Sequence, residues 1–140
     1  MKSKFKAMVL SCIDPRFQPF VFNFLKKKKL SGKYSLFNIA GAAVGVTHKK
    51  FKKWHPTFFD NLKSSIVLHK IQKLIIMNHI DCGAVKIAIS KEKINFSNEF
   101  KIHKESFFIL KKIIKKKFPK LKTEFYLITL EKKIIKFDKI

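Results

Sequence analysis

Two short segments, far apart in the sequence, hold side chains that can bind a metal ion. They are Cys12-Ile13-Asp14-Pro15-Arg16 and His79-Ile80-Asp81-Cys82-Gly83. In the second, the His-x-x-Cys spacing lets an imidazole nitrogen and a thiolate reach the same ion, and Cys12 of the first would add another thiolate. Three protein ligands leave one position open, as in catalytic zinc sites, whereas structural zinc sites close with four. The spacing therefore predicts a metal site formed by Cys12, His79 and Cys82.

Two charged residues follow Cys12 closely enough to act at the open position of such a site. Asp14 can accept a hydrogen bond from a water there, but its carboxylate would coordinate the ion itself unless another group held it. Arg16 is the only arginine in a chain with 32 Lys and Arg residues, and a guanidinium can hold a carboxylate with two parallel hydrogen bonds. Arg16 can therefore hold Asp14 beside the open position and keep its carboxylate off the ion.

Each of these residues also has an ordinary structural interpretation. A single cysteine is more often a small buried apolar residue than a ligand, and a histidine at a strand end is more often a satisfied structural residue. Asp14 and Arg16 can be a simple ion pair of a loop. A Cys12–Cys82 disulfide is a further alternative, although a reducing cytoplasm disfavours it. The combination of all five residue types favours metal binding.

The hydrophobic pattern predicts elements that would bring the two segments together. Short apolar runs indicate buried strands, and longer amphipathic stretches indicate helices. Both segments follow predicted strands, and ligands of parallel sheets lie at the carboxyl ends of strands. We expect an α/β fold with a mostly parallel sheet of four to five strands and helices on both faces. Strands are expected over residues 6–11, 34–39, 74–77, 124–130 and 134–137, and helices over 18–30, 57–71 and 103–118.

Length and composition narrow the class of protein. With 140 residues, 46% of them hydrophobic, the chain is expected to form one domain over residues 1–140. Lysines interrupt every apolar run, so we expect no membrane span, and the charged N-terminus argues against a secretory signal. Two cysteines do not make a disulfide scaffold. We therefore expect a cytoplasmic protein.

The formal net charge of +23 raises the question of a nucleic-acid partner. However, almost all the basic residues are lysines in a chain also rich in Ile and Phe, which is typical of compositional bias. We interpret the charge mainly as solvated surface. The alternative is a zinc-stabilised binding module in which residues 47–55, where Lys alternates with Phe51 and Trp54, bind nucleic acid by stacking on bases.

The two segments resemble the motifs of the β-class carbonic anhydrases. That family has a Cys-x-Asp-x-Arg motif and a His-x-x-Cys motif in this order, and Phe37-Asn38-Ile39-Ala40-Gly41 is similar to a further family segment between them. The resemblance implies that Cys12, His79 and Cys82 bind zinc and that Asp14 and Arg16 are catalytic. It also implies reversible hydration of CO2 to bicarbonate by zinc-bound hydroxide, in a homodimer or homotetramer.

Further site residues and alternatives follow from the resemblance. Gly83 is expected to offer its backbone to a substrate oxygen, Gly41 to let the backbone approach the substrate, and Phe17, with Phe20 and Val44, to line an apolar cleft. This sequence has Pro15 and Phe37 where the family usually has Ser and Arg. It also starts close to its first predicted strand, so the N-terminal helical arm of the family is not expected. Hydrolysis of CS2 or COS by the same zinc chemistry stays open as an alternative.

Overall fold

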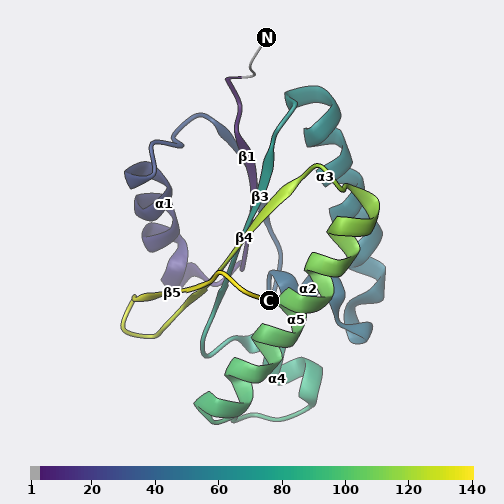
Figure 1. The fold of residues 1–140 in the computed structure, drawn as a ribbon. Coiled ribbons are helices and arrows are strands. Elements are labelled where there is room, and N and C mark those ends of the chain that lie inside the picture. Colours follow the sequence, from purple (N-terminus) through teal and green to yellow (C-terminus); the bar gives the residue numbers. More distant parts are fainter. Residues whose placement is uncertain (1–3) are drawn as a thin grey trace.

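A five-stranded sheet runs through the middle of the molecule (Figure 1). The structure is a computed structural model that describes residues 4–140; Met1–Ser3, which entered the argument against a secretory signal, lie outside the described residues. The strand order is β2-β1-β3-β4-β5, and only β5 is antiparallel to its neighbour. The strands are β1 (Ala7–Ser11), β2 (Tyr34–Asn38), β3 (Lys73–His79), β4 (Lys122–Ile128) and β5 (Ile134–Phe137).

Helices cover both faces of this sheet. Helix α1 lies on one face, and α2, α3 and α5 lie on the other (Figure 1). The helices are α1 (Gln18–Lys27), α2 (Ala43–Thr47), α3 (His55–His69), α4 (Gly83–Ile89) and α5 (Phe96–Lys117), with 3-10 turns at Pro15–Phe17 and Lys49–Trp54. This is the predicted α/β class.

The two cores explain why the strands are apolar at consecutive positions. Ala7 and Val9 of β1 pack on the α1 side, whereas Met8 and Leu10 pack on the side of α2, α3 and α5. Successive side chains of a strand point to opposite faces, so a strand buried on both faces shows no polar alternation. All five residues of β1 are buried.

The predicted strands are all present, with ends shifted by no more than two residues. Helix α1 ends three residues earlier than expected. Lys29, two residues after the helix, has a left-handed φ of 61°, and the Leu30 N–H donates to the Leu25 carbonyl at 3.0 Å. This is a Schellman ending, in which a non-glycine residue takes the left-handed position.

Helices α2 and α4 were not predicted, and α5 begins earlier than predicted. Helix α4 begins directly after Cys82. Helix α5 starts at Phe96 rather than at residue 103, because the Asn95 side chain caps it by accepting the Asn98 N–H at 2.8 Å.

Small residues of the segment between β2 and α2 allow close packing. A Cβ on Gly41, whose φ is +81°, would lie 2.8 Å from the Ala84 Cβ. A Cβ on Gly45 would lie 2.1 Å from the Ala40 carbonyl oxygen. The segment before α2 thus packs closely on α4, which brings the surroundings of Cys12 and Cys82 together.

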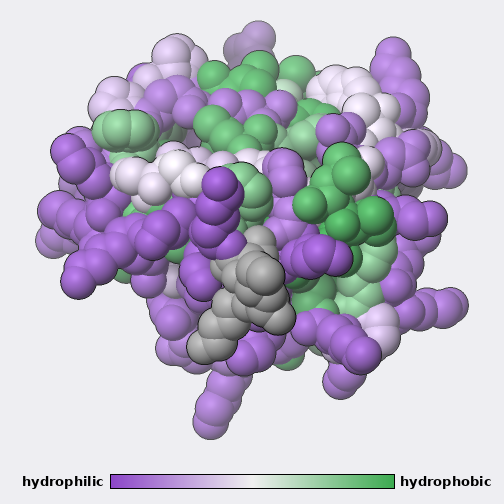
Figure 2. All heavy atoms as spheres, turned by 90° about the horizontal axis from the view of Figure 1, so that it is seen from above, coloured by the Kyte–Doolittle hydropathy of each residue, from purple (hydrophilic) through white to green (hydrophobic). Residues whose placement is uncertain are grey.

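Exposed lysines occur on helices, strands and turns along most of the described chain. Figure 2, a view onto the end of the molecule where the chain begins, shows hydrophilic side chains over most of this face with hydrophobic patches between them. Phe51 is buried and stacks on the half-buried Trp54, with ring centroids 4.6 Å apart. Phe51 is therefore not available to stack on bases. Among residues 4–140, no helix is both long and apolar enough to cross a bilayer.

Candidate metal centre

The strand order places the two predicted segments side by side. β1 and β3 are parallel neighbours, with Ser11 opposite Met77. The chain continues from β1 to β2 at one edge of this pair and from β3 to β4 at the other, so the strand order reverses between β1 and β3. Cys12 directly follows β1, His79 is the last residue of β3, and Cys82 is the N-cap residue of α4. Ligand sites of open parallel sheets lie at this kind of switch point.

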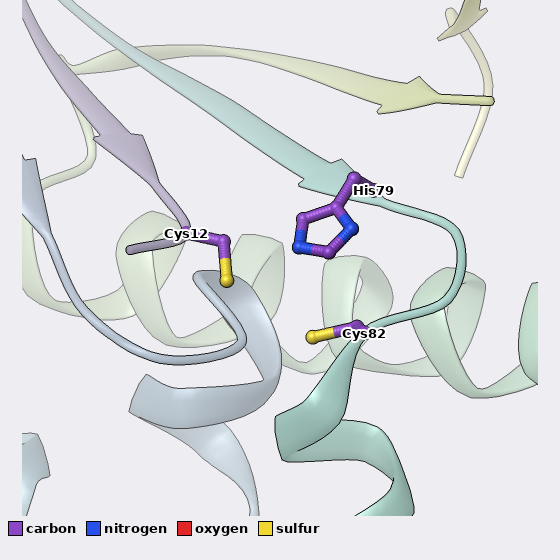
Figure 3. A group of neighbouring side chains, drawn as sticks. All are labelled: Cys12, His79 and Cys82. Carbon is purple, nitrogen blue, oxygen red and sulfur yellow. The ribbon is translucent and has the colours of Figure 1, made fainter. Parts of the chain in front are cut away.

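The candidate ligand atoms of Cys12, His79 and Cys82 all lie within 4.8 Å of one another, and all three residues are buried (Figure 3). The His79 Nδ1–H donates to the Ile80 carbonyl at 2.9 Å, so Nε2 carries the free lone pair. This Nε2 atom is buried and has no hydrogen-bond partner among the described residues. A buried nitrogen without a partner, facing two sulfur atoms, fits a metal ligand.

The two sulfur atoms compete for one proton. A hydrogen bond from the Cys82 thiol lowers the pKa of Cys12 far below its ordinary value, and the same contact together with burial raises the pKa of Cys82. A divalent cation bound here would replace that proton and stabilise both thiolates. Metal binding at these residues would therefore release that proton and would weaken as the pH falls.

Asp14 lies beside the three candidate ligands and is held by Arg16. The Arg16 Nη2 donates to Asp14 Oδ2 at 2.8 Å, and its Nε donates to Oδ1 at 3.1 Å. Asp14 Oδ2 lies 3.7 Å from His79 Nε2. The hydrogen bonds from Arg16 lower the pKa of Asp14 to about 2, so this carboxylate is ionised at neutral pH.

A pocket of about 560 Å³ opens over this group of residues. Its polar lining comes from Asp14 and Arg16, with Cys12 and the Gly83 backbone beside them. The rest of the wall is apolar and comprises Ile13, Pro15, Ala40, Ala84 and Ile87. Of the three candidate ligands only Cys12 lines the pocket, which sets this residue and the Asp14 carboxylate beside a wall suited to a small apolar molecule.

Comparison with known proteins identifies the family. The model of the family described as "Putative carbonic anhydrase" matches residues 1–118. The chain belongs to this family. Relatives by sequence include an uncharacterized protein of Rickettsia bellii, 30% identical over 125 residues, which cover 89% of this chain and 76% of the relative. An uncharacterized protein of Rickettsia conorii is 29% identical over 89% of this chain and 67% of its own length.

The fold is shared with solved β-carbonic anhydrases. One neighbour is the β-carbonic anhydrase CafA of Aspergillus fumigatus, with a TM-score of 0.61 and 9% identity over 97% of this chain and 76% of that chain. Another is a tetrameric β-carbonic anhydrase of Sordaria macrospora, with a TM-score of 0.61 and 10% identity over 99% and 83%. At this identity the likeness shows the fold, while the carbonic anhydrase family rests on the sequence.

The other residues expected at a carbonic anhydrase site lie at different distances from the pocket. The Gly41 N–H donates to Cys12 Sγ at 3.3 Å, so Gly41 contacts a candidate ligand. The Phe17 ring is buried and stacks on His79 with centroids 4.2 Å apart, but does not line the pocket. Phe20 and Val44 belong to the hydrophobic cores and do not line it either.

Two acidic residues at this site were missed by the sequence reasoning. Asp81, with a left-handed φ of 62°, accepts from Arg16 Nη1 at 3.1 Å through its side chain and from Nη2 at 2.9 Å through its carbonyl. Lys86 also binds Asp81, at 2.6 Å. The second residue is Glu99 of α5, which is buried below the turn that carries Cys82. Asp81 lies within the His-x-x-Cys motif, and this position in the sequence could have identified it as a residue of the site.

Proposed function

We propose that this protein is a zinc-dependent enzyme that reversibly hydrates CO2 to bicarbonate. The observation that carries the proposal is the Asp14 carboxylate, which Arg16 holds beside His79 of the Cys12, His79 and Cys82 cluster. The family and the β-carbonic anhydrase fold support the same reaction. We place the enzyme in the cytoplasm, where a reducing environment keeps both cysteines available as ligands.

Cys12, His79 and Cys82 fit Zn²⁺ by their chemistry. Thiolate sulfur and imidazole nitrogen are the usual zinc ligands in proteins, and a set of three leaves one position open. The unpartnered Nε2 of His79 supplies the imidazole lone pair. When bound, Zn²⁺ acts as a Lewis acid that lowers the pKa of a coordinated water and so makes a nucleophile available at neutral pH.

Asp14 orients the attacking water by accepting a hydrogen bond through Oδ2, the oxygen on the His79 side. Arg16 supports this role in two ways: it keeps the carboxylate ionised, and it fixes the carboxylate plane with its fork of N–H groups. Asp81 binds the other edge of the same guanidinium, so Arg16 is held between two acidic residues. A carboxylate restrained in this way is less free to turn onto the metal.

The pocket suits the proposed substrate. CO2 is small and apolar, and the wall formed by Ile13, Ala40, Ala84 and Ile87 can take it up without binding the more polar product strongly. The N–H of Gly83 is our candidate donor to a substrate oxygen, because Gly83 lines the pocket and, apart from its chain neighbours and the backbone of its own helix, no heavy atom lies within 4 Å of a Cβ built on it.

The test is stopped-flow CO2 hydration on samples whose zinc content is measured in parallel. We expect activity to rise in proportion to zinc content, to disappear on treatment with a chelator and to return with Zn²⁺. Protein with full zinc occupancy and no hydration of CO2 would overturn the proposal. In that case the same samples are assayed with COS and CS2, since the apolar pocket also fits these linear molecules and activity on them alone would identify a different hydrolase.

We further propose a homodimer or homotetramer. The described tetrameric state of the Sordaria macrospora enzymes supports an assembly in this fold, and Ile13 and Ile87, 58% and 63% exposed, present apolar surface at the pocket. Light scattering coupled to size-exclusion chromatography should give a mass of two or four chains. Replacing Ile87 by Glu should shift that mass toward one chain, and a monomeric wild-type protein would contradict this expectation.

A further inference from the structure

Glu99 is a buried carboxylate that the proposed reaction does not use. It lies on α5 with 2% of its surface exposed, directly below the turn between β3 and α4. Its Oε1 accepts the N–H of Asp81 at 2.9 Å, and its Oε2 accepts the N–H of Cys82 at 3.0 Å. A carboxylate is expensive to bury unless several donors satisfy it, so its place under this turn needs an explanation.

The third donor to Glu99 is His103, one turn further along α5. Its Nε2 lies 3.0 Å from Glu99 Oε2, and its Nδ1 lies 2.8 Å from the Asn78 Nδ2. An amide nitrogen can only donate, so Nδ1 of His103 accepts and Nε2 carries the hydrogen that Glu99 receives. The Asn78 orientation is fixed in turn, because its Oδ1 accepts the Ala43 N–H at 3.0 Å.

These contacts join the surroundings of the two cysteines. Ala43 is the first residue of α2, and two residues before it the Gly41 N–H donates to Cys12 Sγ at 3.3 Å. A continuous path therefore runs from the segment that contacts Cys12, through Asn78, His103 and Glu99, to the backbone of Cys82. We call Asn78, His103 and Glu99 the buried network.

We propose that the buried network is a positioning device that sets the separation of Cys12 and Cys82, and thereby the affinity and geometry of the metal centre. The inference rests on the proposed function, which assigns these cysteines as ligands. The turn needs such support because Asp81, a non-glycine residue, has the left-handed φ of 62°, a conformation that the surrounding structure must hold. Outer hydrogen bonds orient metal ligands in this way in other proteins, and their loss weakens metal binding.

The test is the variant Glu99→Gln, which keeps the size of the side chain. Its single oxygen cannot serve all three donors, and its NH2 group would face at least one of them. We expect Zn²⁺ binding, measured by competition with a chromophoric chelator, to weaken by about 10- to 100-fold. The visible spectrum of the Co²⁺-loaded protein should change in its d–d and thiolate charge-transfer bands, since these bands report ligand geometry.

The control is Glu105→Gln, the same change at an exposed position of the same helix, which should leave both measurements at the wild-type values. A second variant, His103→Gln, interrupts the network but leaves Glu99 with its two backbone donors. It should shift both measurements in the same direction by a smaller amount. His103→Gln decides the question if Glu99→Gln does not fold.

Unchanged Zn²⁺ affinity and an unchanged Co²⁺ spectrum in the folded variants would overturn the proposal, even if thermal stability fell, because the network would then support only the fold. Failure of the proposed function looks different. A wild-type protein that binds Zn²⁺ without hydrating CO2 removes the function and leaves the network testable. A wild-type protein that binds neither ion overturns both.

Discussion

Replacing Cys82 by serine should abolish zinc binding. Cys82 is 1% exposed and is the residue through which the turn after β3 offers its sulfur to the cluster. A serine hydroxyl is not deprotonated under conditions in which a thiol becomes a metal-bound thiolate, and thiolates are preferred zinc ligands. We expect the metal content measured by elemental analysis to fall from about one zinc per chain to near zero.

The matched control is His55→Gln, which removes a histidine outside the cluster and should retain full zinc. A chelator-treated wild-type sample gives the reference for thermal stability, because Cys82→Ser and the metal-free protein should then unfold at similar temperatures. Full zinc content in Cys82→Ser would contradict the assignment of this ligand and would point to another donor in its place.

The candidate ligands were predictable because they stand where apolar runs end. Every position of β1, and every position of β3 after Lys73, is buried on one face or the other, so the runs are continuous and their ends are visible. Cys12 and His79 follow from those ends, and the parallel arrangement places them at one edge of the sheet. Local patterns were sufficient here because burial of the strand dictates both its length and its residue types.

Glu99 could not be predicted from its neighbourhood. It lies in the stretch Lys91–Phe100, whose charged residues suggest an exposed segment, and α5 was expected to begin after it. What buries Glu99 is the pair of N–H groups of Asp81 and Cys82 in a distant turn. The contact between Asp81 and Arg16 could not be predicted for the same reason, since the two residues are 65 positions apart in the sequence. Such contacts depend on the assembled fold and leave no periodic signal.

Phe17 shows how the right residue can be expected in the wrong place. The family resemblance led us to expect Phe17 in an apolar cleft, and its ring does lie at the site, against His79. However, the 3-10 turn Pro15–Phe17 carries the ring behind His79, where it stacks on the imidazole, and not into the pocket. The sequence placed Phe17 near the site correctly, but the backbone turn determined the direction of its side chain.

Replacing Asp14 by asparagine should leave zinc bound and lower CO2 hydration strongly. Asp14 is outside the three candidate ligands, so the metal content should stay at the wild-type level. The amide has the size of the carboxylate, but Arg16 requires an acceptor and attracts the amide oxygen. The NH2 group then faces His79 and the pocket, where the proposed reaction needs an acceptor. We expect kcat to fall by about 10²- to 10³-fold.

The pH profile separates this role from that of a titrating base. Hydrogen bonds from Arg16 hold the pKa of Asp14 at about 2, below the usual 3.8, so the carboxylate is ionised at every pH above this value. Replacing the Asp14 carboxylate by an amide should therefore lower the hydration rate by the same factor across pH 6–9, without moving the inflection of the pH profile. Asp60→Asn, an exposed carboxylate on α3, should change neither quantity. A fully active Asp14→Asn enzyme would show that the position next to the metal needs no hydrogen-bond acceptor from this loop. The pairing of Asp14 with Arg16 would then only stabilise the turn.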